Sequence, residues 1–132
     1  MPAVLVAPES PALVLEPSEY APAKARRYLT ERFAELGLGD DFVGRVVVTE
    51  LVTNAYKHVG IGRIIVRVLP DVRLNLAVIE VWDEGIALPV VRGENDDAED
   101  GRGLLLMAQL VHDWGVRRIG GEGKVVWARC AR

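Results

Sequence analysis

The stretch TELVTNAYKH, residues Thr49–His58, lies inside an otherwise apolar segment whose pattern is typical of a helix. Within it the polar residues Glu50, Asn54 and His58 recur every four positions. Residues spaced by four lie above one another on one helix face, so a carboxylate, an amide and an imidazole form one stripe. The stripe has three open explanations: it faces solvent, His58 favours the helix end through the helix dipole, or the stripe lines a pocket.

A pocket lined by this stripe would suit phosphate chemistry. The Glu50 carboxylate can act as a base, and the Asn54 amide oxygen can bind a hard cation. Mg²⁺ suits such a site because it takes oxygen ligands and is usually shared with phosphates. A metal hydrolase that uses Glu50 and His58 is a weaker explanation, since the sequence offers no convincing third ligand.

The sequence around this stretch predicts two successive helices. The first is expected over residues 22–36, with Gly37 after it as a left-handed cap. The second is expected to begin after an aspartate cap, Asp40 or Asp41, and to stop at Gly60. Three consecutive valines in this segment favour a strand by themselves, but the aspartate before it and the glycine after it indicate a helix.

Beyond Gly62 the apolar residues alternate with polar ones, as they do in half-buried strands. Strands are expected at residues 63–69, 73–83, 114–119 and 124–130, with a turn in LPDVR between the first two and a helix at 101–113. The predicted fold class is α+β: a two-layer α/β sandwich with helices on one face of a mixed, mostly antiparallel sheet. Residues 1–20 are expected to form an arm or an edge strand.

Composition and charge narrow the class of protein. The 132 residues fit a single domain, and a formal net charge of −3 gives no electrostatic footprint for nucleic acid. The single cysteine, Cys130, indicates a reducing compartment. The N-terminus lacks a basic leader, and no apolar run approaches the roughly 20 residues that span a bilayer. We therefore expect a soluble, cytoplasmic protein that contacts neither membrane nor nucleic acid.

Two further motifs follow the helical stripe. In VWDEG, Asp83 comes at the end of a strand and Gly85 follows, a pattern that an ordinary turn also explains. In GRGLLLM, residues 101–107, two glycines precede an apolar helix, which is typical of a hinge or of a phosphate-binding helix start. Taken in order, the three motifs and the acidic loop between the last two would supply the parts of an ATP site.

These motifs resemble those of a known family. ELVTNAYKH resembles the N-box of the GHKL ATPases, which include the histidine-kinase catalytic domains, while VWDEGIALP and GRGLLLM resemble the first and second glycine boxes. DWGV and GKVVWA resemble the endings of small bacterial members, the anti-sigma-factor serine/threonine kinases and their actinobacterial relatives. The resemblance covers roughly residues 21–129. The compact length favours the anti-sigma type over a sensor kinase.

The resemblance implies a role for each residue of the N-box. Glu50 matches the general base that acts on the attacking hydroxyl, and Asn54 matches the asparagine that holds Mg²⁺. Lys57 and His58 fall where N-box side chains approach the phosphates. Asp83 of the first box matches the aspartate that accepts a hydrogen bond from the adenine amino group.

The glycine boxes are implied to contact the rest of the nucleotide. Gly85 lets the backbone pass close to the base, and Ala87 stands where the first box often has a second glycine. The second box, at the triphosphate, comprises Gly101, Arg102, Gly103 and Leu104. Residues 86–100 correspond to a lid over ATP, and five carboxylates between residues 94 and 100 make it strongly acidic. Val125 replaces a hydroxyl residue that commonly helps to hold adenine.

The resemblance implies an anti-sigma-factor serine/threonine kinase that uses Mg-ATP to phosphorylate an anti-sigma-antagonist protein and also holds a sigma factor, commonly as a homodimer. The alternative is an ATP-gated regulatory binding module of the same fold without kinase activity, which Val125 and the acidic lid favour. The basic cluster Lys24, Arg26 and Arg27 can be a docking feature or an ordinary solvated helix face.

Overall fold

The computed structural model describes residues 12–58, 60, 62–85, 102–120 and 123–132. Within these residues the chain forms three helices and five strands. In chain order they are β1 (Leu13–Leu15), α1 (Ala21–Leu36), α2 (Phe42–His58), β2 (Ile64–Asp71), β3 (Leu76–Asp83), α3 (Arg102–Leu110), β4 (Asp113–Arg118) and β5 (Lys124–Ala131).

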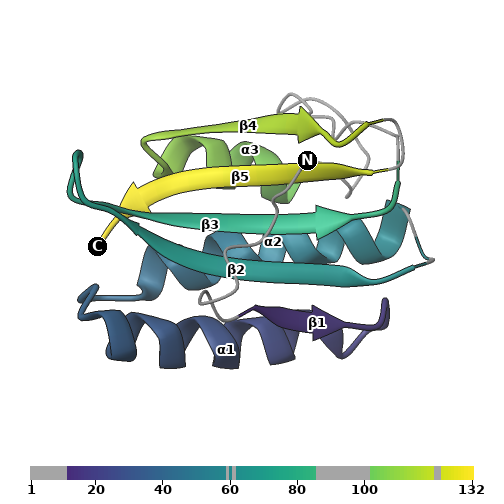
Figure 1. Ribbon diagram of the computed structural model, residues 1–132, viewed down its shortest axis with the longest axis horizontal. Helices are drawn as coiled ribbons and strands as arrows, with labels where there is room; N and C mark the ends of the chain where they lie inside the picture. The colour runs from purple at the N-terminus through teal and green to yellow at the C-terminus, as the bar shows by residue number, and fades with distance from the viewer. Residues whose placement is uncertain (1–11, 59, 61, 86–101, 121–122) are drawn as a thin grey trace.

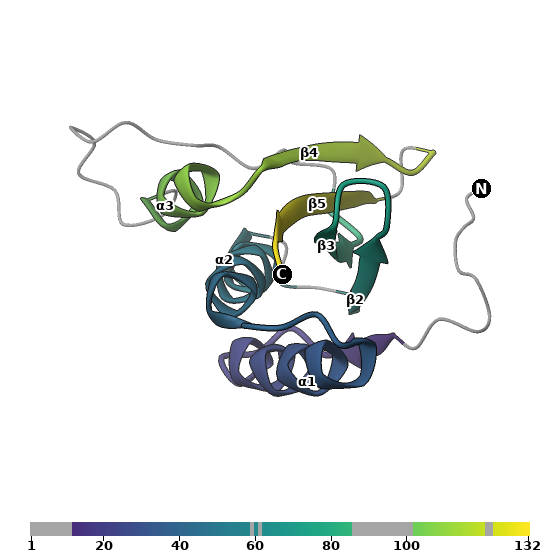
Figure 2. The same ribbon diagram turned by 90° about the vertical axis from the view of Figure 1, so that its left-hand side faces the viewer.

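The strands form one sheet in the order β1-β2-β3-β5-β4 (Figure 1). The three helices cover one face of that sheet, as the turned view in Figure 2 shows. The predicted α+β, two-layer architecture is therefore confirmed. The sequence predicts a mixed sheet, whereas all four pairings between the described strands are antiparallel. Hairpins join β2 to β3 and β4 to β5, which accounts for two of these four antiparallel pairings.

Both predicted helix caps are present. Gly37 ends α1 in the left-handed conformation, with φ of 64°. The Asp40 carboxylate accepts a hydrogen bond from the Phe42 backbone N–H at 2.7 Å and so caps α2. Asp41 instead accepts from the Thr30 hydroxyl at 2.6 Å, which ties the start of α2 to α1.

The core lies between the helices and the sheet. One face of α1 and one face of α2 are buried against β2, β3 and β5, and the contributing helix residues are Ala25, Leu29, Phe33, Val47, Val48, Leu51 and Val52. Val47 and Val48 are fully buried in this core, so tertiary packing outweighs the preference of the valines for strands. No helix in the described part of the chain is both long and apolar enough to cross a membrane.

The hairpin turn lies further along the chain than LPDVR predicts. Pro70 pairs with Ala77 within the ladder, and the turn comprises residues 72–75. Asn75 takes a positive φ of 58°, a conformation that asparagine tolerates better than most residues. Pro70 fits inside the strand because β1 pairs only with residues 64–66, which leaves the far half of β2 at a sheet edge.

The last helix is shorter than the predicted residues 101–113. After α3 ends at Leu110, the backbone N–H of His112 donates to the Arg129 carbonyl at 2.8 Å, so the chain has already joined the sheet. Asp113 then begins β4 opposite Arg129. The apolar sequence continues past the end of the helix, and this is why the pattern alone places the end too late.

Candidate functional site

The polar stripe on α2 lies at the border between the core and solvent. Glu50 and Asn54 are partly buried, whereas Lys57 and His58 are exposed at the C-terminal end of the helix. A purely solvent-facing stripe would expose Glu50 and Asn54 as fully as it exposes His58. That explanation therefore fits Lys57 and His58 but fails for Glu50 and Asn54.

Glu50 has the electrostatic environment of a candidate base. Burial raises the pKa of its carboxyl above the ordinary value of 4.5, and the nearby charge of Lys57 opposes part of that rise. A raised pKa makes a carboxylate a stronger proton acceptor, which suits general-base work. Glu50 also borders a groove of about 310 Å³ between α1 and α2, so it can be reached from outside the core.

Asn54 is oriented as a cation ligand requires. Its Nδ2 donates a hydrogen bond to the backbone carbonyl of Glu50 at 3.0 Å. A carbonyl can only accept, so the NH₂ end of the amide must face the helix and the Oδ1 end must face away from it. Amide oxygen is a normal Mg²⁺ ligand, and Mg²⁺ at a nucleotide needs only one or two protein oxygens beside the phosphates.

Asp83 lies on the helix-covered face of the sheet, at the end of β3. Its side chain is only 3% exposed, and Oδ1 accepts hydrogen bonds from Lys124 Nζ at 2.9 Å and from the Gly85 backbone N–H at 2.8 Å. Among the described residues, no hydrogen bond engages Oδ2. The carboxylate is therefore fixed in place and retains one oxygen that can accept from a ligand.

The residue beside Asp83 is Lys124 rather than Val125. In the antiparallel register Asp83 pairs with Lys124, and Trp82 pairs with Val125. Side chains alternate between the two faces of a strand, so Val125 points to the face without helices, away from Asp83. The hydrophobic residue at Val125 is therefore not a neighbour of the Asp83 carboxylate. Sequence reasoning missed Lys124, which only the β3–β5 register reveals.

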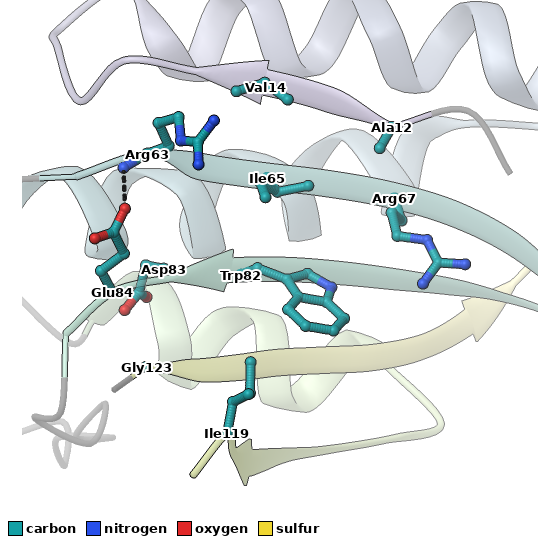
Figure 3. Close-up of a pocket in the computed structure, with 10 residues that line it drawn as sticks. All are labelled: Ala12, Val14, Arg63, Ile65, Arg67, Trp82, Asp83, Glu84, Ile119 and Gly123. Carbon is teal, nitrogen blue, oxygen red and sulfur yellow. Dashed lines mark hydrogen bonds between the residues drawn. The ribbon is translucent and has the colours of Figure 1, made fainter. Parts of the chain in front are cut away.

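Two glycines let the backbone close around the end of β3. A Cβ at Gly123 would stand 2.5 Å from the Asp83 carbonyl oxygen, a distance at which the strand would have to shift. A Cβ at Gly62 would stand equally close to the Glu84 carboxylate. Glu84 itself turns away from the helix layer and accepts from the Arg63 backbone N–H at 2.9 Å (Figure 3).

The second glycine box is described only in part. Arg102 begins α3, and Leu104 is 1% exposed in the core, so the Leu104 side chain packs the helix against the sheet. Gly101 and Ala87 lie outside the described residues, as does the proposed lid at residues 86–100. The start of α3 can therefore offer backbone N–H groups to a phosphate, while Leu104 and Met107 face the core.

The polar stripe lies on α2 in the helix layer, Asp83 ends β3 in the sheet, and the described part of the third motif begins α3. α2 packs against β3, β5 and α3. Figure 1 shows the C-terminal end of α2 and the arrowhead of β3 on the same side of the molecule. The described residues show no direct contact between Glu50 or Asn54 and Asp83. Glu50 borders the groove between α1 and α2, and Asp83 borders a hollow at the end of β3.

A different hollow lies on the sheet face without helices. It has a volume of about 590 Å³ and is lined by Ile65, Arg67 and Trp82, among others (Figure 3). Arg67 and Glu80 form a nearly buried ion pair on this face, with 3.4 Å between Nη1 and Oε1. Among the predicted site residues, Asp83 at the end of β3 also borders this hollow, whereas Glu50 and Asn54 do not.

The predicted basic cluster does not form one surface. Arg26 Nη1 donates to the Thr49 hydroxyl at 3.2 Å, which directs this side chain toward α2. Lys24 and Arg27 are exposed. Of the three basic residues, only these two side chains lie on the solvated face of α1.

Comparison with known proteins decides the family. A model of the histidine kinase-like ATPase domain matches residues 15–130, from β1 to β5. The chain belongs to the histidine kinase-like ATPase domain family. This match supports membership of the GHKL superfamily, whose motifs the sequence resembles. A search of curated proteins returns no match.

The residues of this histidine kinase-like ATPase domain fit Mg-ATP. Asp83 offers a fixed acceptor for a base, and Asn54 offers an amide oxygen for Mg²⁺. Among the described residues, no group of three His, Cys, Asp or Glu side chains could hold a metal ion by itself. A cation held by Asn54 would therefore depend on phosphate oxygens and water for its other ligands, which is the usual arrangement for Mg²⁺ at a nucleotide.

Proposed function

We propose that this ATPase domain is an anti-sigma-factor serine/threonine kinase, which binds Mg-ATP and phosphorylates an anti-sigma-antagonist protein. The family indicates nucleotide binding. The observation that supports kinase chemistry is the pair on α2: a partly buried Glu50 with a raised pKa, one turn before an Asn54 whose Oδ1 is turned outward. A base and a metal ligand one turn apart can act in the same phosphoryl transfer, the base on the attacking hydroxyl and the metal ion on the phosphates.

Each residue of the proposed site has one role in this mechanism. Asp83 binds the base, and the N–H groups at the start of α3 face the phosphates. Asn54 holds Mg²⁺, which when bound offsets the negative charge of the phosphates. Glu50 accepts the proton of the attacking serine or threonine hydroxyl. Lys57 and His58, exposed at the end of α2, can approach the phosphates as flexible cationic or hydrogen-bonding groups.

The alternative function is an ATP-gated binding module without kinase activity. Val125 favours it in the sequence, but the side chain at that position lies on the opposite sheet face from Asp83. The acidic residues between 94 and 100 still favour it, because carboxylates near a triphosphate repel it. In either function we propose that the partners are a sigma factor and its antagonist, and that the chain acts as a homodimer in partner switching.

A phosphate-transfer experiment separates the two functions. Calorimetry first measures the binding of ATP and ADP with and without Mg²⁺. The chain is then mixed with radiolabelled ATP and the antagonist protein that co-purifies with it. We expect Glu50→Gln to bind ATP as the wild type does and to transfer phosphate about 10²- to 10⁴-fold more slowly, the usual contribution of a positioned base.

The matched control is Glu31→Gln, which makes the same change on the exposed side of α1. It should leave both binding and transfer unchanged. Normal transfer by Glu50→Gln would remove Glu50 from the mechanism. Nucleotide binding by the wild type without any transfer would favour the binding module.

A further inference from the structure

The buried ion pair at the end of β3 places a hydrogen-bond donor directly beside an acceptor. Lys124 and Asp83 have side chains that are 6% and 3% exposed, and their Nζ and Oδ1 atoms lie 2.9 Å apart. The Lys124 ammonium has three N–H donors, and only one is engaged by the described residues. Asp83 Oδ2 is likewise unengaged among these residues. A ligand at this position therefore meets an acceptor and a donor next to each other.

Purine bases present different patterns to such a pair. On adenine, the exocyclic amino group is a donor and the neighbouring ring nitrogen N1 is an acceptor. On guanine and hypoxanthine, O6 is an acceptor and N1–H is a donor, so the order is reversed. Adenine thus complements an acceptor beside a donor. Guanine in the same pose would set O6 against the carboxylate and N1–H against the ammonium.

We propose that Lys124 donates a hydrogen bond to N1 of adenine while Asp83 accepts from the amino group, so that the pair selects adenine over guanine nucleotides. The proposal rests on the proposed function, because it requires a nucleotide base at Asp83. Lys124 is then a specificity-determining residue of the site, beyond its structural ion pair with Asp83.

The surrounding backbone holds the Asp83 and Lys124 side chains in fixed positions relative to each other. The Gly85 N–H also donates to Asp83 Oδ1, so this carboxylate cannot rotate without losing two hydrogen bonds. Lys124 is the β5 residue directly opposite Asp83, and Gly123 before it fits only because it has no Cβ. A site whose polar groups are fixed and shielded from water discriminates strongly, because a mismatched base leaves them unpaired.

The test compares ADP with GDP by calorimetry on the wild type and on two variants. Lys124→Met removes the donor and is expected to weaken ADP binding about 10- to 100-fold, the usual range for a charge-assisted hydrogen bond. It should not weaken GDP binding, so the preference for ADP falls. Lys124→Gln retains an N–H donor and is expected to keep that preference.

The matched control is Arg67→Met, which breaks the other nearly buried ion pair of the sheet, on the face without helices. Both methionine variants should melt at a lower temperature than the wild type, but only Lys124→Met should change the ratio of ADP to GDP affinity. An unchanged ratio in a folded Lys124→Met would overturn the proposal. Absence of ADP binding to the wild type would instead contradict the proposed function.

A ligand variant tests the same contact on the unmodified chain, in case Lys124→Met does not fold. The ADP analogue 1-deaza-ADP keeps the amino group but replaces N1 with C–H, so it cannot accept from Lys124. We expect it to bind the wild type about 10- to 100-fold more weakly than ADP. Equal affinities of ADP and 1-deaza-ADP would show that Lys124 does not read N1.

Discussion

Glu50 shows how a single residue can be both useful and destabilising. Its carboxyl is partly buried on α2, and burial disfavours the charged form. The folded state therefore holds the proton more tightly than the unfolded chain does. Sites of chemistry often have such groups, because a proton acceptor needs a pKa nearer to neutrality than a free carboxylate has.

The linkage between this pKa and stability gives a prediction. Because the folded pKa lies above the ordinary value of 4.5, the contribution of Glu50 to stability is largest at low pH and is lost as the pH rises through the folded pKa. We expect Glu50→Gln, which is always neutral, to melt at a higher temperature than the wild type at pH 7. Below about pH 4 the two melting temperatures should converge, because both side chains are then uncharged.

Thermal unfolding of both proteins between pH 3.5 and pH 7.5 measures this difference. Glu31→Gln on the exposed side of α1 serves as the control and should track the wild type throughout. A Glu50→Gln protein that is less stable than the wild type at pH 7 would mean that the carboxylate makes stabilising contacts that outweigh its burial.

At the scale of secondary structure, Arg129 joins three strands on the sheet face without helices. Its guanidinium donates to Asp113 of β4 at 2.8 Å through Nε and to Asp71 of β2 at 3.4 Å through Nη1. It also lies over the Trp127 ring, 5.3 Å from the centroid. β4 is the edge strand beyond β5, so the pair with Asp113 opposes its detachment.

Asp113 therefore makes the stability of this edge depend on pH. The hydrogen bonds from Arg129 lower the pKa of the Asp113 carboxyl from 3.8 to about 2. A lowered folded pKa contributes stability that is complete above the unfolded pKa and is lost as the pH falls through about 2. We expect Asp113→Asn to reduce the melting temperature at pH 6 and to make little difference near pH 2.

Melting curves of wild type and Asp113→Asn at pH 6, 4 and 2.5 provide the measurement. Because Asp113 is about one-third exposed, solvent screening keeps the effect modest. A constant difference between the two proteins at every pH would show that the asparagine acts through packing rather than through the lost charge.

At the scale of the whole molecule, the proposed site depends on segments that are distant in sequence. The polar stripe is on α2, the pair that we propose reads the base joins β3 to β5, and the N–H groups that we propose face the phosphates begin α3. No single element contains a complete site. Binding should therefore reinforce contacts between elements more than contacts within them.

Hydrogen exchange tests this arrangement. We expect saturating Mg-ADP to slow amide exchange in the second half of α2, around Asp83 and Lys124, and at the start of α3. The hairpin turn at residues 72–75 should be unaffected, because it lies at the opposite end of β3. Protection that leaves out Asp83, Lys124 and the start of α3 would contradict this arrangement.

The sequence by itself determined the elements and most of their ends. The cap at Asp40 and the stop at Gly37 could be predicted because they depend on local backbone geometry, which neighbouring residues settle. The turn after β2 could not be placed as well. It depends on how much of β2 is covered by β1, which is a contact between distant segments.

The tertiary structure alone decided which side chains meet. The motifs indicated Glu50, Asn54 and Asp83, but the ladder between β3 and β5 determined that Lys124 faces Asp83 and that Val125 faces away. A shift of one residue in a strand register exchanges its two faces, and a linear pattern does not define the partner residue. For this reason the sequence could indicate the kind of site, while only the pairing of β3 with β5 could show that the Lys124 side chain lies beside the Asp83 carboxylate.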